Sequence, residues 1–225
     1  SATWKDGRAR IPAFLDDHAF LADALLDLLQ ARWRTADLEF AVALADAMLA
    51  HFADPAGGFW FTAHDAERLV HRGKTYADEA LPSGNGVAAR VLGRLGTLLG
   101  EARYLEAAER TVAAAWDGLQ RYPHAHPSLL DALEEILAPV QTVVIRGAAP
   151  EASRWAHELS ALYAPRRIVL AIPDDAPALP AALADKRSES ATIAYVCEGA
   201  SCGPPVRSLP RLVRRLRDGL DLAED

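Results

Sequence analysis

The stretch GNGVAARVLGRLGTLLGEARYLEAAERTVAAAW, residues 84–116, decides the class of fold. Residues 84–99 are rich in Ala and Leu, which lose little rotamer freedom in a helix, so one helix is expected there. Gly100 interrupts the pattern, and a second helix is predicted over residues 101–121. The two helices are expected to form an antiparallel hairpin hinged at Gly100.

A similar hairpin is predicted nearer the N-terminus. Its first helix covers residues 12–33, with Pro12 at a first helical position and leucines at helical spacing. Its second helix runs from about residue 36 to residue 52. A shorter helix is predicted within HPSLLDALEEILAP, residues 126–139, with Ser128 as its N-cap.

Beyond Pro139 the sequence pattern changes. QTVVIRG (141–147), RRIVLAIP (166–173) and ATIAYVC (191–197) are short β-branched runs typical of strands, separated by helical segments. This β-α-β-α-β-α order is typical of a small parallel sheet. We therefore expect a helical-hairpin domain over residues 1–138 and a small α/β element over residues 139–225. The latter lacks a glycine-rich phosphate loop after its first strand, so a packing element or interaction surface is expected.

Composition narrows the class of protein. Apolar residues make up 51% of the 225 residues, which is ample for a core, and the net charge is −7. A nucleic-acid binder is disfavoured because such proteins present a basic face. No apolar run approaches the ~20 residues needed to cross a bilayer, and the N-terminus lacks the apolar core of a signal peptide. We expect a cytoplasmic protein without nucleic-acid or membrane partners.

Two cysteines, Cys197 and Cys202, stand in a C-x4-C spacing. This is neither the redox C-x-x-C pattern nor a four-ligand zinc set, so quiet thiols in a reducing compartment are expected. The segment CEGASCGPP is rich in turn residues, which leaves open a disulfide or half of a metal site. No metal and no cofactor are predicted.

The head of the first predicted helix carries polar side chains in an unusual place. Helical spacing aligns Asp16 with a mostly solvated face, whereas Asp17 and His18 fall on a stripe that is otherwise apolar. An inward carboxylate needs a partner, because an unpaired buried polar group costs roughly 1 to 3 kcal/mol. One explanation is structural: the helix dipole favours acidic residues in a first turn, and a histidine on an apolar face is usually a core residue with a hydrogen-bond partner. The alternative is a cavity in which Asp17 exchanges protons.

Two further segments could border such a cavity. In GGFWFTAHD, the aromatic residues Phe59, Trp60 and Phe61 either fill the core or stack on a ligand, and Trp60 is the candidate chosen for the site. In HRGKTYADEALPSGN, residues 71–85, cations stand close to acidic residues and a Pro-Ser-Gly-Asn corner follows. The first reading is a solvated loop with an ordinary turn and cap. The second is one wall of a binding site. The candidate residues in this stretch are Arg72, Lys74, Asp78, Ser83 and Asn85.

The segments AFLDDHAFL, GGFWFTAHD, RGKxxxDEALPSGN and AYVCEGASCGPP resemble, in this order, the C-terminal half of the YyaL-type family of spermatogenesis-associated, thioredoxin-domain-containing proteins. The resemblance implies a thioredoxin-like domain earlier in a longer parent chain. It also implies an (α/α) toroid of six hairpins, similar to N-acylglucosamine 2-epimerases and six-hairpin glycosidases. This chain would hold an incomplete six-hairpin barrel in a mainly α fold. The aligned positions are Asp16, Asp17, Arg72, Lys74, Asp78, Pro82, Ser83, Gly84 and Asn85, whereas His18 replaces the usual Tyr.

Two functions stay open on these grounds. In the first, a central cleft binds or processes a carbohydrate or another small molecule, as a hydrolase or an epimerase. Asp17 would be the general acid and Asp78 its paired base, with carboxyls roughly 5 to 9.5 Å apart. An epimerase would instead pair His18 with His64 or His71. The remaining substrate-binding candidates are Asp16, His18, Trp60, Arg72, Lys74, Ser83 and Asn85. In the second function, the chain is a non-catalytic helical scaffold that accompanies the thioredoxin-like domain.

Overall fold

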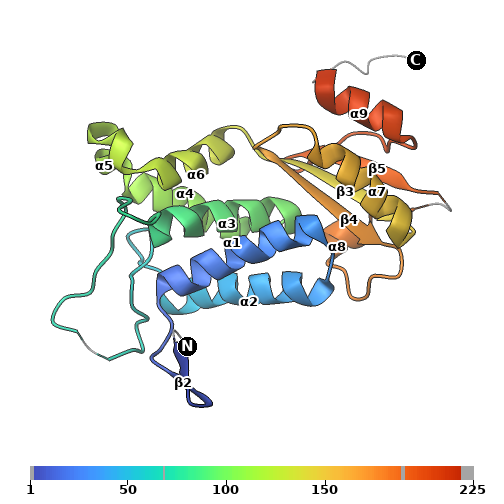
Figure 1. Ribbon diagram of the computed structural model, residues 1–225. Coiled ribbons are helices and arrows are strands. Elements are labelled where there is room, and N and C mark those ends of the chain that lie inside the picture. Colours follow the sequence, from blue (N-terminus) through green and yellow to red (C-terminus); the bar gives the residue numbers. More distant parts are fainter. Residues whose placement is uncertain (1–2, 68, 189–190, 219–225) are drawn as a thin grey trace. The chain divides into compact units, whose positions relative to one another are not determined.

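The structure is a computed structural model that describes residues 3–67, 69–188 and 191–218 (Figure 1). About half of the chain is helical, and a small mixed sheet follows the helices. This agrees with a mainly α fold followed by a small α/β element. The chain forms two compact units: residues up to Leu26 with Leu38–Ala138, and Asp27–Asp37 with the residues from Pro139 onward.

The first unit is built from helices, preceded by a short antiparallel ribbon that sequence analysis missed. The ribbon pairs β1 (Thr3–Lys5) with β2 (Arg8–Arg10). The helices are α1 (Leu15–Ala31), α2 (Thr35–His51), α3 (Gly84–Leu99), α4 (Ala102–Ala114), α5 (Trp116–Arg121) and α6 (Pro127–Leu137), with the 3₁₀ turn η1 (Pro123–Ala125) before α6. Helix α3 packs against both α4 and α6. The apolar core between α3, α4, α5 and α6 contains Ala89, Val112, Ala115, Leu119, Leu129 and Ala132.

The ends of α3 follow the local chemistry of the sequence. Ser83 is the N-cap, with φ −68° and ψ 138°, and its hydroxyl accepts a hydrogen bond from the N–H of Gly86 at 3.1 Å. Gly100 ends the helix in the left-handed conformation, at φ 73°, where glycine carries no steric penalty. The predicted hinge at Gly100 is thereby confirmed.

Three predicted helix boundaries are wrong. The first helix begins at Leu15 rather than residue 12, so Pro12 does not take a first helical position. The segment expected as one helix over residues 101–121 breaks at Ala115, where the backbone bends between α4 and α5. The N-cap of α6 is His126 rather than Ser128, because Pro127 takes the first helical position, which suits its fixed φ. The N–H of Ser128 instead donates to Asp78.

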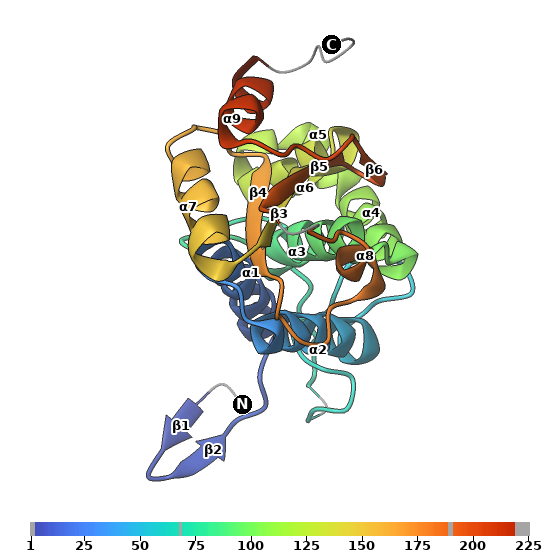
Figure 2. The same cartoon turned by 90° about the vertical axis from the view of Figure 1, so that its right-hand side faces the viewer.

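The second unit contains β3 (Gln141–Gly147), α7 (Ala149–Ser160), β4 (Arg167–Pro173), α8 (Ala181–Ala184), β5 (Ile193–Glu198), β6 (Ser201–Cys202) and α9 (Leu209–Asp218). The strand order is β4-β3-β5-β6, which can be followed in Figure 2. One face of the sheet packs against α7 and α9 through Val143, Ile145, Trp155, Leu159 and Leu212.

The expected all-parallel sheet is wrong for the last strands. Strands β3 and β4 are parallel, but β5 runs antiparallel to β3, and β6 runs antiparallel to β5. A parallel addition needs a crossover, usually a helix, that carries the chain back along the sheet. The helix between β4 and β5 has only four residues, too short for that return.

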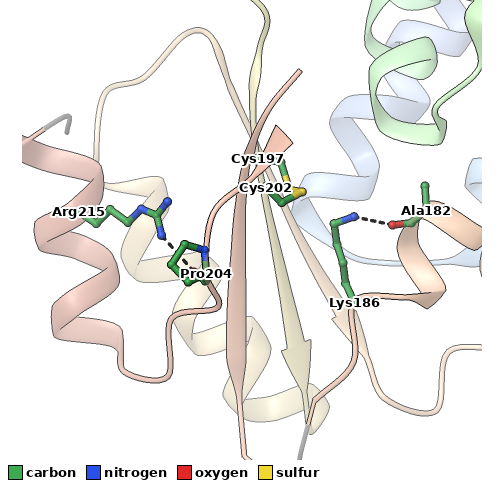
Figure 3. The surroundings of a disulfide bond; sticks show 6 residues. All are labelled: Ala182, Lys186, Cys197, Cys202, Pro204 and Arg215. Atoms are coloured by element: carbon green, nitrogen blue, oxygen red, sulfur yellow. Dashed lines mark hydrogen bonds between the residues drawn. A yellow bond between two sulfur atoms is a disulfide. The ribbon is translucent and has the colours of Figure 1, made fainter. Parts of the chain in front are cut away.

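Cys197 and Cys202 form a disulfide, so the expectation of two quiet thiols is wrong (Figure 3). The two residues lie directly opposite each other in the β5–β6 register, which brings their side chains together. Cys197 is buried and Cys202 is exposed. Across the part of the chain that the structure describes, no helix has the length and apolar character required to span a membrane.

Candidate functional site

A pocket of about 310 Å³ lies in the first unit, where the head of α1 meets the Pro-Ser-Gly-Asn corner. Its charged lining residues are Asp16 from α1 and Glu79 from the loop before α3. Phe61 and Leu81 supply apolar surface, and both are largely exposed. The opening helix and the corner therefore border one hollow, although not through Asp17 and Asp78, the two carboxylates predicted to be catalytic.

Asp16 is the carboxylate of α1 that faces this pocket. A Cβ added at Gly84 would lie 2.0 Å from Asp16 Oδ1, so the absence of a side chain at Gly84 lets the carboxylate approach the start of α3. Among the residues that the structure describes, none hydrogen-bonds to this carboxylate. Burial raises the pKa of Asp16 above its usual 3.8, and the neighbouring charge of Asp17 raises this pKa further.

The predicted inward orientation of Asp17 is wrong. Its side chain is exposed, and its Oδ2 accepts a hydrogen bond from the N–H of Phe14 at 2.8 Å. The helix begins at Leu15, so Asp17 lies in the first turn, where a carboxylate satisfies an N–H group that has no partner within the helix. Neighbouring residues of a helix point about 100° apart. Asp16 can therefore face the pocket while Asp17 faces solvent.

His18 is a satisfied, partly buried residue that does not line the pocket. Its Nδ1 lies 2.7 Å from the carbonyl oxygen of Phe14, and its ring packs against Phe52 with centroids 5.0 Å apart. His64 instead pairs with His51, at 5.6 Å between ring centroids, and His71 is exposed. The facing pair of histidines considered for an epimerase is therefore not formed by these residues.

Asp78 connects three parts of the first unit. One oxygen accepts from the N–H of Ser83 at 2.9 Å and from the hydroxyl of Ser128 at 2.5 Å, and the other accepts from the N–H of Ser128 at 2.8 Å. Burial alone would raise the pKa of Asp78, but hydrogen bonds from Ser128 and Ser83 outweigh it, and this pKa lies below the usual 3.8. Asp78 does not line the pocket, and its carboxylate joins the loop to the starts of α3 and α6.

Asn85 borders the pocket, but its side-chain amide hydrogen-bonds to the protein backbone. Its Oδ1 accepts from the N–H of Phe59 at 2.7 Å, while its Nδ2 donates to the carbonyls of Phe59 at 2.9 Å and Thr75 at 3.0 Å. Both N–H donors of the amide are thereby used, and the residue is 1% exposed. Ser83 is likewise buried, caps α3 and contacts the hydroxyl of Ser128 at 3.2 Å.

Trp60, Arg72 and Lys74 form a cation–aromatic cluster outside the pocket lining. Arg72 lies over the indole ring at 5.0 Å from the centroid, and Lys74 at 4.9 Å. The ammonium of Lys74 also pairs with Asp54 at 2.6 Å, with both side chains mostly buried. Burial opposes the charge of Lys74, but the hydrogen bond to Asp54 prevails and its pKa is raised. The positive charge of Lys74 is thus balanced by Asp54 within the protein.

Glu79 and Phe61 line the pocket but are not among the site residues predicted from the sequence. Glu79 directly follows Asp78 in the quoted motif, so its residue type was visible but its direction was not. Phe61 is 39% exposed and stacks on Phe14, with ring centroids 4.6 Å apart. Within residues 3–67, 69–188 and 191–218, no group of three His, Cys, Asp or Glu side chains is placed to hold a metal ion.

The chain is similar in sequence to one group of known proteins. No known protein-family profile matches it. It is 30% identical over 203 residues to spermatogenesis-associated protein 20 of Homo sapiens, which covers 86% of this chain and 26% of the human protein. The proteins of the same name from Mus musculus and Rattus norvegicus are each 29% identical over the same length, with the same shares. The chain thus spans about a quarter of the length of these relatives.

Proposed function

We propose that in this chain, which belongs to the spermatogenesis-associated protein 20 family, the pocket beside Asp16 binds a carbohydrate. The helical unit contributes some hairpins of an (α/α) toroid, and a longer parent chain supplies the others together with a thioredoxin-like domain. Cytoplasmic localisation belongs to the same proposal.

The observation that carries the proposal is the state of Asp16. Its carboxyl borders a pocket of about 310 Å³, accepts no hydrogen bond from the described residues and has a raised pKa. Partly buried carboxylates with a raised pKa gather at sites of proton transfer. A raised pKa lets Asp16 keep its proton to a higher pH than an ordinary aspartate does.

The roles within the pocket follow from the residues that line it. Asp16 acts as the proton donor toward a leaving oxygen, and Glu79 is the second carboxylate in place of Asp78. Phe61 offers its exposed face to the sugar ring. Asn85 and Ser83 hold the corner in shape through their bonds to the backbone and to α3, rather than binding hydroxyl groups themselves.

The test is saccharide-induced thermal stabilisation across a broad glycan panel. We expect at least one saccharide to raise the melting temperature of the wild-type chain, and Asp16→Asn or Phe61→Ala to remove most of that shift. Glu39→Gln is the matched control, because Glu39 is exposed on α2, does not line the pocket and should leave the shift intact. A shift that is lost in Glu39→Gln but kept in Asp16→Asn would contradict the proposal.

A helical scaffold without catalysis is the second candidate, and one observation favours it. Asp78, Asn85 and Lys74 all direct their polar groups into internal bonds, as expected of residues that hold a loop in place. The same experiment separates the two. If no saccharide shifts the wild type, while Asp78→Ala and Asn85→Ala lower its stability strongly, the scaffold is supported and the carbohydrate site is rejected.

A further inference from the structure

A second cavity, of about 420 Å³, lies within the α/β unit at the carboxyl end of β3. Strands β3 and β4 are parallel, so their carboxyl ends meet at one edge of the sheet. Arg146 is near the end of β3, and Asp174 directly follows β4. Open α/β sheets bind ligands preferentially outside the carboxyl ends of their parallel strands.

Arg146 is a buried cation, and two of its three guanidinium nitrogens have no hydrogen-bond partner among the described residues. Its side chain is 7% exposed. Among the described residues, neither its Nε nor its Nη1 has an acceptor, although both atoms are buried. Its Nη2 lies 3.9 Å from Asp174 Oδ1, which is beyond hydrogen-bond distance. A buried guanidinium in this state is unfavourable unless an anion or another acceptor reaches it. Burial lowers the pKa of Arg146 accordingly.

Asp174 does not neutralise this cavity. Its carboxylate is 46% exposed, and its Oδ2 already accepts a hydrogen bond from Ser188 Oγ at 2.7 Å. Arg187 is a second cation in the lining, and its carbonyl accepts from the hydroxyl of Tyr195 at 2.7 Å, which fixes the backbone there. Two arginines against one aspartate leave the lining with a net charge of +1.

We propose that this cavity binds the carboxylate or phosphate group of a small molecule, with Arg146 as the principal ligand-binding residue and Arg187 at the entrance. The planar guanidinium presents five N–H donors, which suit the oxygens of either group. The cavity is much larger than a single anionic group, so the ligand carries an organic part as well. No glycine-rich loop follows β3 to offer backbone N–H groups to an anion. The side chain of Arg146 donates in their place.

The experiment is an NMR titration of the 225-residue chain in chloride-free buffer near pH 7, following the Nε–H signal of Arg146. Inorganic phosphate and acetate are added in separate series. We expect a saturable shift of this signal with at least one of the two anions. Saturation with phosphate alone assigns a phosphorylated ligand, and saturation with acetate alone assigns a carboxylate.

Two variants are expected to change the affinity for the anion in opposite directions, and a third is a control. Arg146→Met, followed through the backbone amides around the cavity, should stay folded, because it removes a buried charge whose one ion pair, to Asp174, is long. It should weaken anion binding by about 10-fold or more. Asp174→Asn should tighten binding several-fold by removing the opposing carboxylate. Arg211→Met changes an exposed arginine of α9 and should leave binding within about 2-fold. The proposal is overturned if neither anion shifts the Arg146 signal, or if Arg146→Met binds as tightly as the wild type.

Discussion

Replacing Asp78 by Ala should destabilise the first unit by about 3 kcal/mol. The carboxylate accepts three hydrogen bonds, from the N–H of Ser83 and from the N–H and hydroxyl of Ser128. Bonds to a charged acceptor contribute roughly 1.5 to 3 kcal/mol each, but bonds that share one carboxylate do not add fully. For a chain of this size, the loss corresponds to a melting temperature lower by about 6 to 12 °C. Urea unfolding followed by circular dichroism measures it.

The pH dependence of the same variant tests the cause. The pKa of Asp78 is lower in the folded state than its usual 3.8. The stability contributed by this group is therefore fully present above 3.8 and is lost as the pH falls through the folded-state pKa. The difference between wild type and Asp78→Ala should be constant from pH 8 to pH 5 and should shrink in more acidic buffer. Glu79→Ala, an exposed neighbour, should change stability by less than about 0.5 kcal/mol. A difference below about 1 kcal/mol at pH 7 for Asp78→Ala would refute the reasoning.

Three further substitutions test other parts of the structure. Asn85→Ala should cost about 2 to 4 kcal/mol and speed amide exchange at Phe59, because it leaves buried backbone groups unpaired; unchanged exchange would count against this role. Asp16→Asn should raise stability by about 1 kcal/mol at pH 7 in thermal unfolding. Because the pKa of Asp16 is raised, this gain should fade as the pH falls and the wild-type group takes up its proton; a loss at pH 7 would be contrary. Lys74→Met should cost about 2 kcal/mol by leaving Asp54 without its ammonium, and adding Asp54→Asn should recover most of it; simple additivity would argue against the pair.

The parts of the fold that could be predicted are those set by local chemistry. Helical periodicity predicted the two hairpins, and the cap at Ser83 and the left-handed Gly100 follow from residue type alone. The antiparallel direction of β5 could not be predicted, because strand direction depends on how the connection returns across the sheet. The disulfide had been left open, since it depends on the register that places Cys197 opposite Cys202.

The position of the pocket could be predicted better than the side chains that line it. The Pro-Ser-Gly-Asn corner does border the pocket, but the uses of Asn85 and Asp78 depend on partners distant in the sequence. Asn85 bonds to Phe59, 26 residues away, and Asp78 bonds to Ser128, 50 residues away. No periodic pattern carries such information. The choice between Asp16 and Asp17 depended on which face of α1 is buried. Leu21 and Ala24, which share a face with Asp17, are exposed, so that face of the helix is the solvated one.

A carbon-13 NMR titration of the side-chain carboxyls of Asp16 and Asp17 tests the central claim most directly. If Asp16 faces the pocket and Asp17 faces water, Asp16 titrates above 3.8, and Asp17→Asn lowers the Asp16 pKa by removing a neighbouring negative charge. Adding a saccharide that stabilises the protein should move the Asp16 signal. An Asp16 pKa at or below 3.8, insensitive to Asp17→Asn and to every stabilising saccharide, would contradict the account.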